Sequence, residues 1–258
     1  MVKRVSASCA LKTIAASLCK RAASLCKLKL CATALATSLP SQREGVAQKT
    51  LRTLFVVAMT THAAASSVLM LRPRPGGVAL YMALKALAAG CMSEDGLADW
   101  VDASAKHSKR QALSALKAPG VGAFGGCALA LALALEYQAL TSMPASDAIT
   151  ASFVGASHGA LAMAWHWATT AHAYDDQFVK PSRANVMAWS AATFASSWAA
   201  CGLKRSLLLM ATQAALVAGM NTWTVCKLGG RTGDSLGAVR KAMEVASLMA
   251  WTNLFHKS

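Results

Sequence analysis

The sequence predicts an all-α fold, a polytopic transmembrane bundle of about six helices. Of its 258 residues, 55% are hydrophobic and only 14% are charged, whereas soluble chains average about 25% charged residues. The hydrophobic residues also fall in long blocks, several of which approach the roughly 20 residues that a helix needs to cross a bilayer. A soluble helical bundle is the less favoured alternative, because the abundant alanine also suits soluble helices.

The expected helices follow one another along the chain. The apolar blocks that predict them cover residues 51–71, 76–92, 121–143, 148–173, 184–203 and 206–226, and a weaker candidate follows Gly237. Many blocks are rich in Ala, Gly and Ser, which let helices approach closely in lipid. Pro and Gly predict a loop at 71–77, and residues 94–117 form the only long polar stretch between the blocks.

Residues 1–35 differ from the rest of the chain. They contain seven Lys and Arg, no acidic residue, and many Ser, Ala and Cys. Such basic, acid-poor starts are typical of mitochondrial or chloroplast transit peptides. We therefore predict an organellar-targeting extension at 1–35 and a membrane domain at 36–258, in an organellar membrane, with the mitochondrial inner membrane favoured. The alternative is a basic helix that lies on the membrane surface.

The net charge of +15 comes from 26 basic and 11 acidic residues. Outside the N-terminal segment the basic residues lie at the ends of apolar blocks, as at Arg72, Arg74, Lys204 and Arg205. This placement predicts membrane lipids as partners, because anionic head groups attract such residues. The basic residues show no interleaved aromatic pattern for stacking bases, so we expect no nucleic acid. The eight cysteines form no C-x-x-C pair, which argues against a zinc site.

Acidic residues are scarce, yet four of the eleven lie between positions 94 and 102. Asp95, Asp99 and Asp102 follow the i, i+4, i+7 spacing that places side chains on one face of a helix. Like charges at this spacing repel, so a compensating cation is expected. Mg²⁺ is the natural candidate, because it binds carboxylate oxygens and keeps waters for a phosphate ligand. The alternative is a solvated polar loop at a membrane surface.

A second candidate site is the glycine-rich segment 228–238, which reads L-G-G-R-T-G-D-S-L-G-A. Its glycines allow tight turns and expose backbone N–H groups, an arrangement that binds phosphates. A simple turn between helices is the alternative.

The histidines are weaker signals. His158 and His166 lie eight residues apart in one apolar block, so they can share a helix face. We expect them to be interfacial or satisfied core residues, with a haem-binding pair as the alternative.

Together the two motifs resemble one family, cobalamin synthase (adenosylcobinamide-GDP ribazoletransferase). The family's first hallmark, D-G-L-A-D-x-x-D-G, matches residues 95–103 in all but the last position, which is Ala103. Its last hallmark, G-G-x-T-G-D-x-L-G-A, matches residues 229–238 at every fixed position. A weaker echo of T-R-L-P is T-S-L-P at 37–40. The resemblance therefore runs from about residue 35 to the end, with the basic segment as an extension.

The resemblance implies a phosphoryl-transfer reaction. A hydroxyl of α-ribazole would attack the diphosphate of adenosylcobinamide-GDP, a nucleotide-activated corrinoid, and GMP would leave. Mg²⁺ would bind to the catalytic carboxylates, which are Asp95, Asp99, Asp102 and Asp234. The phosphates would contact Gly229, Gly230, Thr232, Gly233 and Lys117.

A central motif departs from the family. Its K-D-S-R-x-G-T-x-G stretch corresponds to residues 117–125, where Ala118, Pro119 and Gly120 replace Asp, Ser and Arg. Glycine cannot make the contact with phosphate that an arginine makes. The sequence thus leaves open whether the protein is an active enzyme. The alternative is a catalytically inactive descendant, a pseudoenzyme that serves as an accessory subunit of a mitochondrial inner-membrane complex.

Overall fold

The computed structural model describes residues 68–69, 76–174 and 180–255. These residues contain eight α-helices and a π-helical turn. They contain no β-strand, only one isolated β-bridge. The predicted all-α class is therefore confirmed. The segment 1–35, the T-S-L-P motif and most of the apolar block at 51–71 lie outside the described residues.

The first two helices form a bent pair. α3 (Gly76–Ala88) and α4 (Met92–Ser104) differ in direction by 83°. The bend lies at Gly90 and Cys91, whose φ angles are 63° and 52°. Glycine adopts positive φ at little cost, whereas the Cβ of cysteine disfavours it. Helix α5 (Lys109–Ala115) follows α4, and the Ser108 hydroxyl caps it by accepting a hydrogen bond from the Gln111 amide at 3.3 Å.

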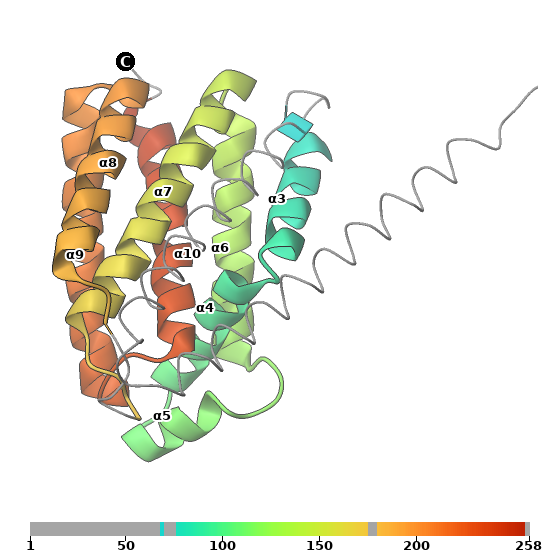
Figure 1. The fold of residues 1–258 in the computed structure, drawn as a ribbon. Helices are drawn as coiled ribbons and strands as arrows, with labels where there is room; N and C mark the ends of the chain where they lie inside the picture. The colour runs from blue at the N-terminus through green and yellow to red at the C-terminus, as the bar shows by residue number, and fades with distance from the viewer. Residues whose placement is uncertain (1–67, 70–75, 175–179, 256–258) are drawn as a thin grey trace, which may run out of the picture.

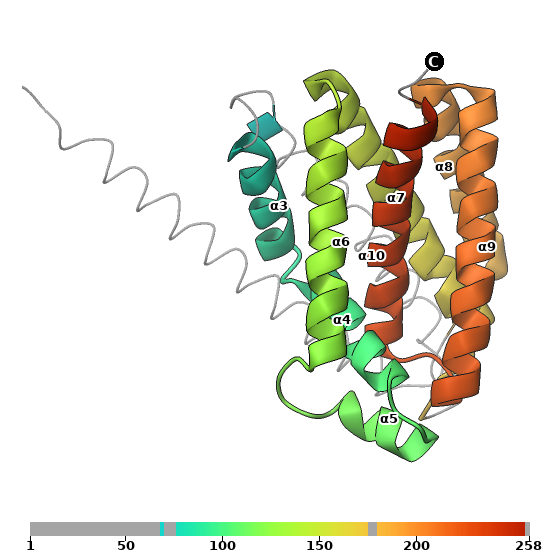
Figure 2. The same cartoon turned by 180° about the vertical axis from the view of Figure 1, so that it is seen from behind.

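Five longer helices form the bundle. They are α6 (Ala123–Ser142), α7 (Ala145–Thr169), α8 (Arg183–Cys201), α9 (Leu203–Leu228) and α10 (Gly233–Ala250), which η1 (Trp251–Phe255) extends. Helix α7 packs against α8, α9 and α10, and α10 also packs against α4 and α6 (Figures 1 and 2). The end of α7, the starts of α6 and α10, and helix α5 meet at the lower end of Figure 1.

The apolar blocks correspond to α3, α6, α7, α8 and α9, and the weaker candidate after Gly237 lies in α10. The polar stretch 94–117 is itself mostly helical, because it contains most of α4 and all of α5. By length and hydropathy, α6 is the one described helix that could span a bilayer by itself, and the bent α3–α4 pair could count as a second. The helical class is thus confirmed, and the membrane embedding stays a prediction.

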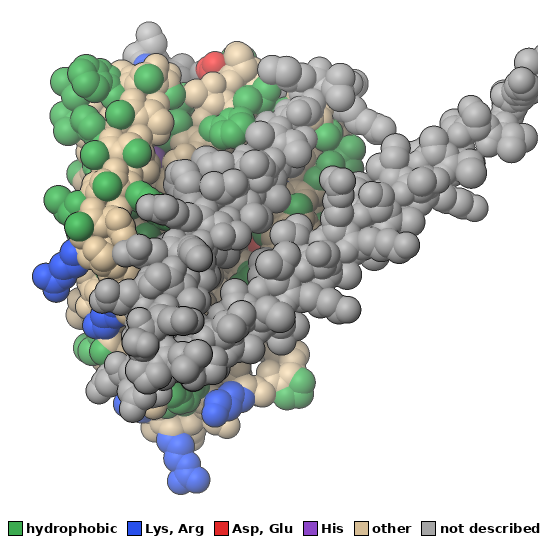
Figure 3. Space-filling view, in the orientation of Figure 1, with side chains coloured by type: hydrophobic (Ala, Val, Ile, Leu, Met, Phe, Trp, Pro, Cys, Tyr) green, Lys and Arg blue, Asp and Glu red, His purple; other side chains and the backbone are tan. Residues whose placement is uncertain are grey.

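Large apolar side chains lie exposed on the outward faces of the bundle. They are Phe124, Leu131 and Leu135 on α6, Met187 and Trp198 on α8, and Leu203, Leu207, Leu208 and Val225 on α9. In Figure 3 hydrophobic side chains cover the upper part of α8 and α9, and Lys and Arg side chains lie lower down. A surface helix of a soluble protein would instead turn charged and polar residues outward.

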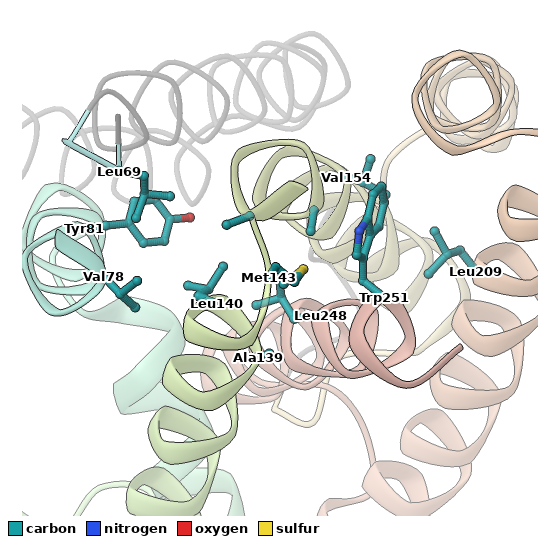
Figure 4. Packing of buried hydrophobic residues seen from close by; sticks show 12 residues of the cluster. Leu69, Val78, Tyr81, Ala139, Leu140, Met143, Val154, Leu209, Leu248 and Trp251 are labelled. Carbon is teal, nitrogen blue, oxygen red and sulfur yellow. The ribbon is translucent and has the colours of Figure 1, made fainter. Parts of the chain in front are cut away.

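The largest apolar core joins α3, α6, α7 and α10 (Figure 4). Leu140 of α6 and Met143, which directly follows that helix, lie between Tyr81 of α3 and Trp251 of η1. Each of these side chains is 6% exposed or less, and burial of a side chain of this size contributes about 1.5–3 kcal/mol. This core fixes α3 and α6 against α10 in the upper half of the bundle.

Both α7 histidines are buried and fully satisfied. One ring nitrogen of His158 contacts Gln213 at 2.8 Å, and one of His166 contacts Asn221, both on α9. The second ring nitrogen of each contacts a serine hydroxyl at 2.9 Å, which for His158 is Ser197 of α8 and for His166 is Ser235 of α10. Because the partners are also eight residues apart in the same order, α7 and α9 run parallel. The prediction of satisfied core histidines is confirmed.

Candidate functional site

The three clustered aspartates lie on one helix, as their spacing predicts. Asp95 is exposed, and Asp99 and Asp102 are partly buried along α4. The αL turn at Cys91 starts this helix in a new direction, so that it carries the carboxylates toward the lower end of the bundle.

The start of α10 brings the fourth aspartate to the same place. Asp234 lies in the first turn of α10, where the helix dipole favours a negative charge. The two helices approach closely at Gly96 and Gly237. A Cβ on Gly96 would lie 2.7 Å from the Asp234 carbonyl oxygen and 3.0 Å from the Gly237 Cα. The glycines of the two hallmarks therefore let α4 and α10 cross where their carboxylates are carried.

The four carboxylates interact electrostatically. Burial raises the pKa of Asp99, and the charges of Asp95, Asp234 and Asp102 add to this effect in that order, which brings the pKa to about 6. Asp99 is thus the centre of the cluster, and the other three predicted aspartates lie within electrostatic reach of it.

Asp102 also has a structural role. Its two carboxylate oxygens accept hydrogen bonds from the backbone amides of Gly122, at 2.7 Å, and Gly125, at 2.9 Å. These amides belong to the N-terminus of α6, whose first N–H groups have no partner within the helix. A side chain on either glycine would collide with the Asp102 carboxylate. Asp102 therefore joins α4 to α6, and the two glycines kept from the central motif make that junction possible.

The glycine-rich segment forms the turn between α9 and α10. Gly229 ends α9 with a φ of 78°, and a Cβ on Gly230 would lie 2.7 Å from the Ala171 carbonyl oxygen. The Thr232 hydroxyl caps α10 by accepting a hydrogen bond from the Ser235 amide at 3.2 Å. By contrast, a Cβ on Gly233 would meet no atom of the described residues within 4 Å. Three of the four candidate phosphate contacts in this segment thus have structural roles, and Gly233 faces away from the rest of the described chain.

Lys117 contacts Tyr174 in the loop after α7. Its ammonium group is 5.0 Å from the centre of the Tyr174 ring. Burial, and next the charge of Asp234, raise the pKa of Tyr174. Tyr174 therefore stands near both the basic and the acidic residue. Its loop is held by a parallel bridge in which the Arg231 amide donates to the Ala171 carbonyl at 2.7 Å.

The changed part of the central motif is an exposed turn before α6 that contains Ala118, Pro119 and Gly120. None of these side chains can replace the contacts of Asp, Ser and Arg. Arg231 is buried against the end of α7, where its Nε donates to the Thr170 carbonyl at 3.1 Å and its guanidinium lies 5.7 Å from the Trp167 ring centre. One of its terminal nitrogens has no hydrogen-bond partner among the described residues.

Carboxylate oxygens of this kind suit a hard divalent cation. Among the residues that the structure describes, no three Asp, Glu, His or Cys side chains converge closely enough to form a complete metal cage. The aspartates nevertheless supply the right ligand chemistry, and three of them act electrostatically on Asp99.

Comparison with known proteins decides the family. The model of the family described as cobalamin-5-phosphate synthase matches residues 29–252, which span both hallmark motifs. The chain belongs to this family. Cobalamin-5-phosphate synthase relatives include an adenosylcobinamide-GDP ribazoletransferase of Rhizobium johnstonii, 34% identical over 200 residues that cover 71% of this chain and 76% of the relative.

Two further relatives carry the same name. The protein of Rhizobium etli is 35% identical over 202 residues, with 71% of this chain and 76% of the relative covered. That of Ralstonia nicotianae is 30% identical over 194 residues, with 70% and 75% covered. No solved structure matches this chain significantly. The resemblance that the hallmarks indicate is therefore confirmed at the level of the family.

In this member of the cobalamin-5-phosphate synthase family, the sequence did not predict some residues that lie near the site. Tyr174 follows an apolar block with no motif around it, and only the loop between α7 and α8 places it near Lys117. Lys109 is a second case, because its ammonium group packs against the Gly229 turn from α5. Charge at the ends of blocks hints at such residues, but their neighbours depend on the packing of helices.

Proposed function

We propose that this protein is a membrane-embedded, Mg²⁺-dependent adenosylcobinamide-GDP ribazoletransferase, which joins adenosylcobinamide-GDP to α-ribazole and releases GMP. The observation that carries the proposal is the crossing of α4 and α10 at Gly96 and Gly237, which brings the carboxylates of both hallmarks together. The names of the relatives support the choice of substrates.

The donor set fits Mg²⁺. This ion keeps several waters and needs only one or two carboxylates besides the phosphates of its substrate, so a complete protein cage is unnecessary. One or two of Asp95, Asp99, Asp102 and Asp234 would bind it directly, and the others would act through its bound waters. When bound, the ion neutralises charge on the diphosphate and stabilises the transferring phosphate.

The reaction is a substitution at phosphorus. A hydroxyl oxygen of α-ribazole bonds to the phosphorus on the corrinoid side of the diphosphate, the bond to the GMP oxygen breaks, and the hydroxyl proton is lost to solvent. Lys117 contacts Tyr174, which also senses the charge of Asp234, and from there the ammonium group would pair with a phosphate oxygen. The open space at Gly233 leaves room for a phosphate at the start of α10.

The distribution of polar residues supports the membrane. We propose that α6 to α10 cross the bilayer, with the acidic cluster at one boundary. Outward faces carry residues such as Leu131 and Trp198, which are 65% and 54% exposed, whereas Lys241 and His158 in the interior are 0% exposed. In lipid, apolar side chains are stable outside and polar side chains must find partners inside.

GMP release tests the activity. Purified protein in lipid vesicles receives adenosylcobinamide-GDP, α-ribazole and Mg²⁺. We expect GMP release that depends on Mg²⁺ and falls by at least about 10²-fold in Asp99→Asn, the order of loss when a charge-stabilising group is removed from an active site. Asp147→Asn is the matched control, since Asp147 begins α7 at the opposite end of the bundle, and it should keep the wild-type rate.

The changes in the central motif raise the opposite expectation for this assay, that no GMP is released. If folded, membrane-inserted protein releases no GMP, the changes at Ala118, Pro119 and Gly120 have removed the activity, and the accessory-subunit role becomes the better reading. Co-purification in a large assembly would then be the next observation to seek.

A further inference from the structure

Six charged side chains form one network inside the bundle. Three are carboxylates and three are cations, contributed by α3, α4, α6 and α10, and their side chains are 13% exposed or less. The network consists of Lys85, Glu94, Glu136, Arg240, Lys241 and Glu244. Among the residues that the structure describes, it contains three positive and three negative charges.

The contacts form a chain from α4 to α3. Lys241 donates to Glu94 at 2.9 Å and to Glu136 at 2.7 Å. Lys85 in turn binds Glu136 and, at 3.3 Å, Glu244. Arg240 adds a bond to Glu244 at 3.1 Å. Each carboxylate except Glu94 therefore has two cationic partners.

Such a network is costly to bury. Each charge loses its hydration, and pairing returns little more than this cost, so a buried ionic network is weak support for stability. Polar networks of this kind do fix one arrangement of the helices around them, because a shifted helix would leave a charge without its partner. Inside a membrane bundle that penalty is larger still.

The network adjoins the acidic site. Glu94 directly precedes Asp95 on α4, and Lys241 follows Gly237 by one helical turn on α10. The glycine contact between Gly96 and Gly237 lets the helices approach, but two surfaces without side chains hardly resist sliding or rotation. The bond from Lys241 to Glu94 is the directional contact at this crossing.

We propose that Glu94, held by Lys241, is a positioning residue for the carboxylate cluster: it fixes the rotation of α4 on α10 that turns Asp95 and Asp99 toward Asp234. This inference rests on the proposed function, because the cluster matters through the Mg²⁺ that it binds. Glu94 is not itself a ligand in this arrangement, since its carboxylate points into the network.

Substitutions at Glu94 test separately whether the length of its side chain and its negative charge are needed. Glu94→Leu removes the bond, while Lys241 keeps Glu136 as its partner. Glu94→Asp keeps the charge but is one methylene shorter, and Glu94→Gln keeps the length and an acceptor oxygen but loses the charge. Lys85→Leu is the matched control, because Glu136 keeps Lys241, Glu244 keeps Arg240, and α4 is untouched.

The measurement is calorimetric titration of Mg²⁺ into each purified, detergent-solubilised protein. Loss of a residue that orients metal ligands typically weakens metal binding by about 10–100-fold, and we expect that loss in Glu94→Leu and Glu94→Asp. Glu94→Gln and Lys85→Leu should bind within about threefold of wild type. Equal Mg²⁺ affinity in Glu94→Leu and wild type would overturn the proposal, as would equal losses in Glu94→Gln and Glu94→Leu.

Hydrogen exchange of the backbone amides of residues 95–102, in metal-free protein, is the second measurement. We expect faster exchange in Glu94→Leu and Glu94→Asp than in wild type, Glu94→Gln and Lys85→Leu. If wild type binds no Mg²⁺, the metal in the proposed function is wrong, and the exchange rates still decide the positioning role: unchanged exchange in Glu94→Leu would overturn it.

Discussion

Asp99 has the most strongly charged surroundings in the acidic cluster. Three other carboxylates act on it, and partial burial removes part of the water that would screen them. The result is a carboxyl group whose pKa of about 6 lies well above the ordinary value near 3.9. The folded protein without a cation is therefore destabilised when this group is ionised.

The sign of the pH effect follows. Between about pH 4 and pH 6, the folded state holds a proton on Asp99 that the unfolded state has lost, so the stability that this proton contributes disappears as the pH rises through 6. We expect Asp99→Asn to unfold at a higher temperature than wild type above pH 6, with the difference vanishing below about pH 4. Thermal unfolding in detergent with a chelator measures this, and parallel curves for the two proteins would contradict it.

At the scale of elements, the junction of α4 and α6 depends on one carboxylate and two glycines. Asp102 satisfies two N-terminal amides of α6, and a net contribution of about 1 kcal/mol is typical for such a cap. Gly125 gives the carboxylate its space and also lies against the Ala98 carbonyl group of α4. Its neighbour Gly126 has no such contact, because a Cβ there would meet only the Val121 side chain at 3.9 Å.

The two adjacent glycines should thus respond in opposite ways to alanine. We expect Gly125→Ala to lower the free energy of unfolding by about 1–3 kcal/mol, the usual cost of overpacking. Gly126→Ala should raise it by up to about 1 kcal/mol through helix propensity. Denaturant unfolding in mixed micelles gives both values. Equal effects of the two substitutions would show that the close approach of α4 and α6 is wrong.

At the scale of the whole molecule, polarity is distributed inside out. Six charged side chains and two histidines lie in the interior, while apolar residues project from α6, α8 and α9 (Figure 3). In water this arrangement would be unfavourable, because it exposes apolar side chains to solvent and removes charged side chains from it. In a bilayer both features are stable. The arrangement therefore supports an embedded bundle, although α6 is the one described helix that is long and apolar enough to span a bilayer by itself.

A substitution at Leu131 tests whether lipid or water surrounds the bundle. It lies 65% exposed near the middle of α6, so Leu131→Lys should lower membrane insertion by about 2.5–3.5 kcal/mol, the cost of a lysine at the centre of a span. Val121→Lys, just before α6, should insert normally. Carbonate extraction of membranes reports both. A Leu131→Lys protein that inserts as well as wild type, or is recovered folded from the soluble fraction, would contradict the membrane proposal.

The sequence by itself determined the helical class, the places of α6, α7, α8 and α9, the alignment of three aspartates on one helix and the family. These features depend on local periodicity and on short motifs, which the order of residues states directly. It also led to satisfied histidines in α7, because a polar residue inside an apolar block must find a partner.

The tertiary structure alone decided which distant residues meet. It placed Asp234 beside the α4 aspartates, set Asp102 on the first amides of α6, and joined Glu94 to Lys241 across 147 positions of sequence. It also decided where α4 lies, because the buried face of that helix packs against α10. Such partners depend on how the helices cross. The crossing in turn depends on the absence of side chains at points such as Gly96 and Gly237, and only the packed helices show which glycines lie at a crossing.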